Sequence, residues 1–586
     1  MAPQLTLRAA LGGMVIGAVM CLSNIYVFFK TGWSLGVTLT ACILGFAVFQ
    51  GLGALKLAKN PMGALENNAL TTVASGAGYM TGGGNMAAFG ALMMVTTLRP
   101  EGPVMIAWFA VIAALGVFAA IPIKRQLIDE EALAFPTGTA TAETIRSLHQ
   151  AGEGGGSGKA KALAISAFLA ALLAFFRDAK APWMPFNIPG TIALPITLAG
   201  RALKDWSLAL KTEVVLMAAG ALMSFRTGWS LLLGGLLTYG VLAPTLVEQH
   251  LIKDVGYKAI VAWTVWPGAA LLVASGLTSF AFDYRSIARS FSGLTGLFRG
   301  RKPEPAATAS EECPDWWFPA GFVVLGPIVI VLMGMLFQIP AWAGLVAVPL
   351  AVLMGFVAAR VTGETDVTPT KALGPVTQLL FGVLTPANLA GNIMSANVTG
   401  GVGLHAADLL TTLKTGKLLG ASPRQQFFAQ LIGVAAGALV VVPAFQLVIP
   451  DPSVLGGDDW PAPSCLVWAG VSKAFAGGLD GLDPSARTAI LIGAGLGVAL
   501  ALLEKLAPKR WTSFLPSPSG LGIAMVVPGA NSIAMFLGAA IAAYMKKYKP
   551  QWAERLVVPV SSGLIAGESL MGIVVALLIV AGVLQK

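Results

Sequence analysis

Ionisable side chains are sparse in the apolar stretches of this sequence, and the few that occur there are the first candidates for chemistry. Glu66 opens a glycine-rich segment, His405 and Asp408 lie three residues apart, and Glu568 follows a run of small residues. Charged groups within a membrane segment are costly, so they commonly bind an ion or a substrate. Residues three apart on a helix share a face, so we expect His405 and Asp408 on one side of their helix.

The three carboxylates Glu66, Asp408 and Glu568 are candidates for coupling transport to protons or other cations. Desolvation disfavours the charged form of a lone carboxylate, so such a group can take up and release a proton. Each also has a structural alternative. Glu66 could cap a helix, Asp408 could join helices through a buried ion pair, and Glu568 could bond to backbone at a helix break. Lys414 lies six residues from Asp408, well round the helix, so we expect a structural or anion-binding role.

Two segments, 72–84 and 392–402, combine glycine with small polar residues and occupy corresponding places in the two parts of the chain. Transporters often carry interrupted helices at such places, and their ends line the substrate site. We therefore expect breaks at 72–85 and 392–403 around a shared cavity. The alternative is that the glycines only allow helices to pack closely. The substrate-binding candidates are the polar residues in or beside these segments: Tyr79, Asn85, Asn397, Thr399, His405 and Lys414.

The elements that position these residues are membrane helices, because 56% of the 586 residues are hydrophobic and only 11% are charged. A soluble domain carries about 25% charged residues. The net charge of +10 is typical of basic cytoplasmic loops, and no basic, aromatic-rich patch indicates nucleic-acid binding. The four cysteines and three histidines are too scattered for a metal site or a disulfide framework, so we expect no metal and no cofactor.

Apolar runs long enough to cross a bilayer recur along the whole chain. The run at 9–29 lacks a cleavage site and is interpreted as a membrane helix, not a signal peptide. With the interrupted segments included, we expect an all-α polytopic protein with roughly 16 helices. The strong runs are 9–29, 33–55, 103–123, 160–178, 229–248, 257–281, 318–338, 340–360, 425–449, 486–506, 518–545 and 556–583. The weaker runs are 66–97, 186–203, 211–225, 371–388, 390–413 and 464–478.

Two basic stretches, 124–159 and 283–315, are predicted to be cytoplasmic, and the second divides the chain into halves 1–282 and 316–586. A repeat supports related building blocks, because Lys30-Thr-Gly-Trp-Ser-Leu recurs as Arg226-Thr-Gly-Trp-Ser-Leu. We expect each copy between two helices, with Lys30 and Arg226 as interface anchors and Trp33 and Trp229 in an aromatic belt.

No nucleotide-binding motif is present, so transport would be driven by a gradient. The stretch Gly152-Glu-Gly-Gly-Gly-Ser-Gly-Lys lacks the spacing of a phosphate-binding loop and is interpreted as a flexible linker. Two alternatives are a channel of the same architecture and an intramembrane hydrolase that uses Ser519 or Ser569 with a histidine. Neither serine has the pattern of a nucleophile elbow.

Six blocks, in order along the chain, resemble the oligopeptide transporter family and are closest to its yellow-stripe-like branch. They read NPMGALENNAL (60–70), LAFPTGTATA (133–142), ADLLTTLKTG (407–416), SPRQQFFAQ (422–430), LPSP (515–518) and SGLIAGE (562–568). The resemblance covers nearly the whole chain. Met62, Ala421 and Glu568 depart from the branch pattern, which leaves the substrate class open.

The resemblance implies about 16 helices from duplicated halves and proton-coupled uptake of short peptides or of metal complexed with an organic chelator. We therefore expect a multi-pass protein of the plasma or inner membrane. Its expected partners are protons, a small substrate and the lipid bilayer. A second copy of the chain, forming a homodimer, is a further possible partner.

Overall fold

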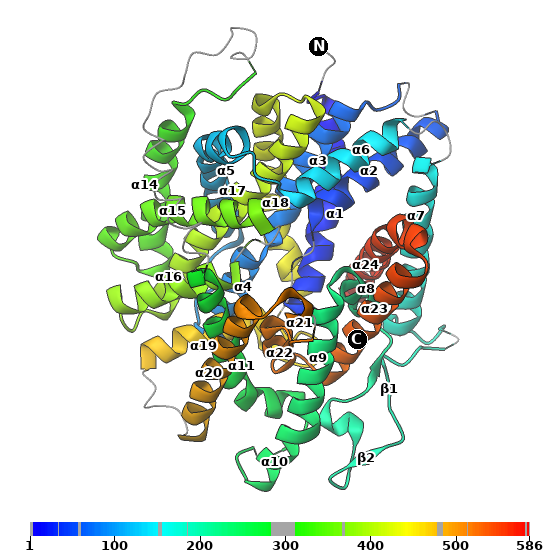
Figure 1. The fold of residues 1–586 in the computed structure, drawn as a ribbon, viewed down its shortest axis with the longest axis vertical. Coiled ribbons are helices and arrows are strands. Elements are labelled where there is room, and N and C mark those ends of the chain that lie inside the picture. Colours follow the sequence, from blue (N-terminus) through cyan, green and yellow to red (C-terminus); the bar gives the residue numbers. More distant parts are fainter. Residues whose placement is uncertain are drawn as a thin grey trace.

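The protein is built almost entirely of helices (Figure 1). The computed structural model describes residues 4–584 except for 33, 35, 57–59, 151–154, 185, 253, 283–310, 366–367, 369, 450, 478–483, 513 and 581–582. Most of the linker predicted at 283–315, and Trp33 of the expected aromatic belt, therefore lie outside the described residues. The all-α polytopic class expected from composition is confirmed.

The helices of the first part of the chain run to α11. They are α1 (Leu7–Thr31), α2 (Val37–Ala54), α3 (Ala64–Gly78), the 3₁₀ turn η1 (Tyr79–Thr81), α4 (Gly83–Val95), α5 (Gly102–Lys124), the π-helix η2 (Arg125–Glu130), α6 (Pro136–Gln150), α7 (Gly155–Asp178), η3 (Leu203–Trp206), α8 (Val214–Leu222), α9 (Phe225–Leu237), η4 (Thr238–Leu242), α10 (Ala243–Glu248) and α11 (Tyr257–Phe282).

The helices of the second part begin at α14. They are α14 (Trp317–Phe337), α15 (Ala341–Thr365), α16 (Thr370–Leu384), α17 (Leu389–Leu419), α18 (Pro423–Val448), η5 (Pro452–Val454), α19 (Pro463–Gly477), α20 (Pro484–Leu506), α21 (Lys509–Thr512), α22 (Pro518–Ala524), α23 (Gly529–Tyr548) and α24 (Pro550–Val580).

The segment 186–203, expected as a weak membrane helix, instead contains short strands, so that prediction is wrong. Strand β1 (Thr191–Ile192) pairs antiparallel with β4 (Leu210–Lys211), and β2 (Thr197–Leu198) with β3 (Arg201–Ala202). Pro189, Gly190 and Pro195 explain the difference, because proline lacks the amide donor that a helix interior needs and glycine weakens a helix.

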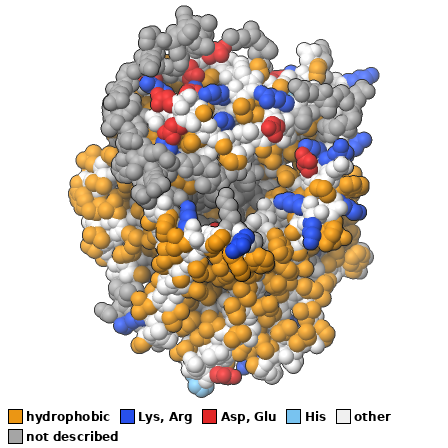
Figure 2. All heavy atoms as spheres, in the orientation of Figure 1, with side chains coloured by type: hydrophobic (Ala, Val, Ile, Leu, Met, Phe, Trp, Pro, Cys, Tyr) orange, Lys and Arg blue, Asp and Glu red, His pale blue; other side chains and the backbone are white. Residues whose placement is uncertain are grey.

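Nine helices among the described residues are long and apolar enough to cross a membrane. Charged side chains gather toward the upper end of the molecule, and a broad apolar belt lies below them (Figure 2). This distribution is the one expected of a protein surrounded by lipid. The polar helices that complete the bundle, α17 among them, do not meet the same measure, so the count of about 16 stays a prediction.

Helix α17 occupies the centre of the bundle and packs against α3, α4, α5, α15, α16 and α18. Every residue from Ala390 to Leu413 is buried. The break expected at 392–403 is absent, because α17 continues through it without interruption. Its glycines allow close packing instead: a Cβ on Gly401 would lie 2.6 Å from a methyl carbon of Ile112 on α5. The packing alternative is therefore the correct one for this segment.

The break expected at 72–85 is confirmed, because η1 separates α3 from α4. A second interruption lies within the span expected at 518–545, where 525–528 separate α22 from α23. Pro528 directly precedes α23, and proline and the residue before it both disfavour a continuous helix.

Two further expectations are wrong. The second copy of the Thr-Gly-Trp-Ser repeat does not lie between helices, because Arg226 falls in the first turn of α9. The glycine-rich stretch before Lys159 is helical from Gly155 onward, as the start of α7, and not a linker. Residues 151–154 of that stretch lie outside the described residues. The other predicted spans correspond to helices with bounds shifted by a few residues.

Candidate functional site

A buried polar seam lies where α3, α17 and α18 meet, and Asp408 is at its centre. Asp408 on α17 accepts a hydrogen bond from the Ser75 hydroxyl on α3 and a second, of 2.6 Å, from Gln430 Nε2 on α18. Ser75 also bonds the Thr38 hydroxyl of α2 at 3.2 Å. The Asp408 carboxylate is 5% exposed and has no ion-pair partner in the part of the chain that the structure describes. Only neutral groups therefore hold it.

The seam continues along α3 toward its first turn. Gln426 on α18 donates to the carbonyl of Thr412 at 2.7 Å and contacts the Thr72 hydroxyl at 3.4 Å. The side-chain amide of Asn68 and the hydroxyl of Thr71 are buried, with no hydrogen-bond partner among the described residues. Buried polar groups are normally paired, so these atoms are available to water or to a substrate.

The two segments singled out by their glycines meet below this seam. Asn397 on α17 donates to the Gly84 carbonyl at 2.9 Å and to Asn85 Oδ1 at 3.0 Å. It also accepts from the indole nitrogen of Trp108 on α5 at 2.7 Å. A Cβ on Gly84 would lie 2.8 Å from the carbonyl carbon of Gly400, so glycine is needed for this approach. The structure thus brings Asn85 and Asn397 together as substrate-site candidates.

Thr399 and Tyr79 lie apart from that pair. Thr399 bonds the Thr377 hydroxyl of α16 at 2.7 Å and is fully buried. Tyr79 begins η1, is partly exposed and packs against the cluster formed by α1, α2 and α3. The expected substrate residues are therefore distributed along α17 and the broken helix and do not form one compact pocket.

His405 is fully buried, and neither ring nitrogen has a hydrogen-bond partner in the described residues. Its Cβ lies against α5, where a Cβ on Gly116 would be 2.9 Å away. Asp408 bonds to α3 and α18 instead. His405 and Asp408 therefore contact different neighbouring helices, although residues three apart lie within about 60° of one another around α17.

Glu66 and Lys414 both have partners. Glu66 lies in the first turn of α3, as expected, and accepts two hydrogen bonds from Arg8 of α1 at 2.6 and 2.5 Å, and a further one from the Thr6 hydroxyl. Lys414 donates to the carbonyl of Leu133 at 2.7 Å, so it ties α17 to the segment before α6. Both arrangements are those of groups that join elements.

Glu568 on α24 is not the solitary carboxylate that the sequence suggested. Its Oε1 lies 2.6 Å from Arg177 Nη1 at the end of α7, and its Oε2 accepts from the Val215 amide at 2.7 Å, in the first turn of α8. Arg177 also bonds Asp178, at 2.7 Å. A charge at this position is therefore compensated by a guanidinium and a helix N-terminus.

A second buried pair adjoins this one. Lys30 Nζ lies 3.2 Å from Glu213 Oε1 and above the rings of Tyr26 and Trp460. Lys30 is only 4% exposed, so its expected role as an interface anchor is wrong. Glu213, just before α8, also lies 3.5 Å from Lys211 Nζ, so two lysines flank this buried carboxylate.

Arg177 and Glu213 were not predicted from the sequence as candidate residues. Arg177 lies at the end of a predicted span, so an intramembrane cation was a usable signal, but its partner is 391 residues away. Glu213 lies within the segment expected at 211–225, so the same signal applied to it. No group of three or more metal-ligating side chains occurs among the described residues.

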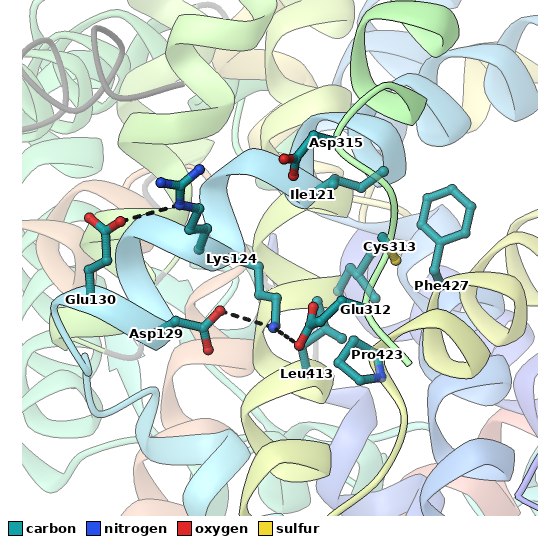
Figure 3. A pocket seen from close by; sticks show the side chains of 12 residues that line it. Ile121, Lys124, Asp129, Glu130, Glu312, Cys313, Asp315, Leu413, Pro423 and Phe427 are labelled. Atoms are coloured by element: carbon teal, nitrogen blue, oxygen red, sulfur yellow. Dashed lines mark hydrogen bonds and ion pairs between the residues drawn. The ribbon is translucent and has the colours of Figure 1, made fainter. Parts of the chain in front are cut away.

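A cavity of about 470 Å³ opens at the charged end of α17 (Figure 3). Its walls come from α5, η2, α17 and the start of α18, and residues just before α14 close one side. It is lined by Ile121, Lys124, Arg125, Asp129, Glu130, Glu312, Cys313, Asp315, Leu409, Leu413, Pro423 and Phe427. Charged side chains of both signs and apolar side chains therefore line the same cavity, as in many small-molecule sites.

The polytopic helical fold and its buried polar centre define a class of membrane transport proteins, and comparisons agree. The family described as OPT oligopeptide transporter protein matches residues 4–579. The chain is 24% identical to an Arabidopsis thaliana protein named as a probable metal-nicotianamine transporter, covering 99% of this chain and 87% of that protein. It is also 24% identical to the iron-phytosiderophore transporter yellow stripe 1 of Zea mays, over 97% of this chain and 89% of that protein.

A Saccharomyces cerevisiae protein, provisionally named as an oligopeptide transporter, is 23% identical over 97% of this chain and 95% of its own length. This chain belongs to the oligopeptide transporter family. It is a multi-pass membrane transporter of small substrates and not an enzyme, which sets the hydrolase alternative aside.

Proposed function

We propose that this protein is a proton-coupled symporter of the plasma or inner membrane that carries short peptides or metal chelates of organic ligands. Its halves, 1–282 and 316–586, would move against one another to expose the site alternately to the two sides. Its partners are then protons, the surrounding lipid and, in a homodimer, a second copy of the chain. The names of its relatives cover both substrate classes.

The observation that carries this proposal is the environment of Asp408. A buried charge is costly unless it is paired, and here Ser75 and Gln430 supply only neutral hydrogen bonds. Binding a proton removes that cost. If the proton leaves toward one side of the membrane while a substrate leaves with it, the cycle couples the two movements. Glu66 and Glu568, by contrast, are already compensated by Arg8 and Arg177.

Substrate binding is assigned to polar groups along α17 and in the broken helix that packs against it. Asn85, Asn397, Thr399 and His405 are expected to hold the substrate, with Tyr79 at the break between α3 and α4. His405 supports this assignment most directly, since both of its ring nitrogens are unpaired in the described residues. Lys414 would attract an anionic group toward the same helix.

Uptake in sealed proteoliposomes tests the proposal. Short peptides and ferric or nickel chelates would be offered with and without an inward proton gradient, to the wild type, Asp408→Asn and Glu568→Gln. Asp451→Asn is the matched control, because Asp451 is exposed and lies between α18 and η5. We expect gradient-dependent accumulation in the wild type and the control and its loss in Asp408→Asn.

Uptake that only equilibrates the solute, with or without the gradient, would refute the symport and favour a channel. Accumulation that is retained in Asp408→Asn but lost in Glu568→Gln would transfer the coupling role to the Arg177–Glu568 pair. The solute that accumulates would decide between the peptide and the chelate class.

A further inference from the structure

Helix α3 is buried from Glu66 to Gly78, yet one of its faces is entirely polar. Asn68, Thr71, Thr72 and Ser75 recur at spacings of three and four residues, so they form a stripe along the helix. The face that packs against α1 is apolar over the same length: Leu70, Val73, Ala74 and Ala77. The polar stripe therefore requires polar neighbours on other helices.

The polar seam supplies those neighbours, because the stripe of α3 faces α17 and α18. Ser75 bonds Asp408, and one turn further along the seam Gln426 contacts Thr72 and the carbonyl of Thr412. Residue numbers fall along α3 while they rise along α17, so the two helices are antiparallel here. The seam therefore leads from Asp408 toward the first turn of α3 and the last turns of α17.

Several polar atoms of the seam have no hydrogen-bond partner among the described residues. They are both amide atoms of Asn68, the hydroxyl of Thr71, and the side-chain carbonyl oxygens of Gln426 and Gln430. All four side chains belong to residues that are at most 2% exposed. Buried polar atoms normally bind the protein or an internal water, and such a water makes about three hydrogen bonds. The concentration of these atoms in one seam therefore indicates internal water beside the polar stripe.

Asp408 is the one charged group that the described part of the seam contains. The other charged side chains of α3, α5, α17 and α18, together with His405, contact different groups. They are Glu66 on Arg8, Lys124 on Asp129, His405 against Gly116 of α5, Lys414 on the Leu133 carbonyl, Lys417 on Asp129 and Arg424 on the Glu312 carbonyl. Helix α2, which reaches Ser75 through Thr38, carries no charged residue. A proton on Asp408 therefore has only neutral groups next to it along the seam.

We propose that the seam holds a chain of internal water along which the coupling proton moves between Asp408 and the charged end of the molecule, and that Asn68 and Thr71 hold this chain in place. From Ser75 to Glu66, α3 extends about 14 Å, a distance that hydroxyl groups and a few waters can bridge. Each water or hydroxyl accepts a proton from one neighbour and passes another to the next. Nothing is oxidised or reduced, and the seam is neutral again after each passage.

The seam ends where the molecule exposes charge. Arg8, whose side chain is 36% exposed, pairs with Glu66 there. At the same end Lys414 of α17 bonds the carbonyl of Leu133, within the basic stretch 124–159 that is expected to be cytoplasmic. A proton that enters with the solute would leave by this route. The inference rests on the proposed transport function, and it names the release path of the coupling ion.

Removal of one unpaired hydroxyl tests the path. Thr71→Val takes it from the seam, and Thr238→Val is the matched control, because the Thr238 hydroxyl is also buried without a partner among the described residues but lies in η4, which packs against α9 and α10. Proton-driven uptake into proteoliposomes should slow several-fold in Thr71→Val and further when Asn68→Leu is added. Thr238→Val should keep the wild-type rate.

Exchange of labelled for unlabelled solute at equal pH separates a proton path from a structural role. Exchange does not require the proton to leave Asp408, so it should continue at the wild-type rate in every variant. Loss of exchange together with uptake in Thr71→Val would overturn the path, since the residue would then be needed for the fold or for the solute. Equal uptake by Thr71→Val and Thr238→Val would overturn it as well.

Silver ions detect the water without any transport, because Ag⁺ is small enough to enter a narrow wet passage and binds thiols. Thr71→Cys and Leu70→Cys would be compared in purified full-length protein that carries Cys313→Ser, since the other cysteines are buried. Leu70 is one residue nearer to the charged end but lies on the apolar face. The thiols that remain after exposure to Ag⁺ would be counted with a maleimide in denaturant.

We expect Thr71→Cys to react many times faster than Leu70→Cys, although its thiol lies deeper. Equal rates would overturn the water chain. A reactive Thr71→Cys in a protein that fails to accumulate solute would leave the water chain standing and refute the symport.

Discussion

Arg177 and Glu568 are separated by 391 residues in the chain, and they form a buried ion pair of 2.6 Å that joins α7 to α24. Their side chains are 4% and 0% exposed. The same carboxylate receives the amide of Val215, so three helices that are distant in sequence converge on one group. Glu568 can be recognised in the sequence as a carboxylate within an apolar run. Its partners cannot be recognised in this way, because they lie on other helices that only the fold brings together.

Removal of one member of this pair should destabilise the protein strongly. Arg177→Gln leaves Glu568 as an uncompensated buried charge, which costs about 3–5 kcal/mol of unfolding free energy. Arg125→Gln, at the more exposed pair with Glu130, should cost about 0–1 kcal/mol. Thermal unfolding of the purified protein would compare them, and equal shifts of the two midpoints would contradict the structural role of the buried pair.

Close packing of α4 on α17 should make Gly84 intolerant of a side chain. Gly84→Ala places a methyl group 2.8 Å from the carbonyl carbon of Gly400, and such overpacking costs about 1–3 kcal/mol. Gly495 in α20 has open space where its Cβ would be, so Gly495→Ala should be neutral or stabilising. Unfolding midpoints would show the difference, and an unchanged midpoint for Gly84→Ala would mean that the helices separate easily.

Two asparagines of α17 and its N-cap should respond to different extents to replacement by aspartate. Asn397 is fully buried and donates to Gly84 and Asn85, so Asn397→Asp removes two donors and sets a carboxylate against two oxygens. Asn388 caps the helix by accepting from the Gly391 amide, which aspartate can replace, and it loses two longer bonds of 3.3 Å to the Phe337 and Gln338 carbonyls, at a partly exposed position. We expect a large loss of thermal stability for Asn397→Asp and a clearly smaller one for Asn388→Asp. Similar losses would argue against the bonding assigned to Asn397.

His405 should matter for substrate more than for folding. Because its ring nitrogens are buried without partners in the described residues, His405→Leu removes an unfavourable burial and should leave thermal stability equal or higher. The rise in unfolding temperature on adding a transported solute should disappear, since the unpaired nitrogens are the groups assigned to it. A variant that unfolds early but still responds to solute would reverse this assignment.

The architecture was largely predictable because lipid imposes long apolar helices, and hydropathy locates these without knowledge of contacts. Hydropathy does not predict, however, whether a glycine-rich segment interrupts its helix, as segments 392–403 and 72–85 show. Both combine glycine with small polar residues, yet α17 runs straight and only the other segment breaks. Glycine permits a break and permits close packing, and the neighbours decide which occurs.

Several residues of the candidate site could be predicted from the sequence, but the residues to which they bond could not. Asp408 and Asn397 stand out as polar residues within apolar sequence, whereas Ser75, Gln430 and Trp108, which bond to them, are ordinary residue types in helices. Partners that lie 22 to 333 residues away are brought together by packing, which no local pattern encodes. Glu568 is the clearest case, since Arg177 changes its role from a free acid to a paired one.

The complete burial of α17 bears on how the protein is made. From Ala390 to Leu413 the helix offers lipid no apolar side, and it is not among the nine described helices apolar enough to cross a bilayer by themselves. During synthesis, the transfer of α17 by itself from the translocation channel into lipid is therefore only weakly favourable. Its neighbours α3, α5 and α15 are made earlier, but α18 follows it, so stable insertion of α17 waits for a helix that has not yet emerged.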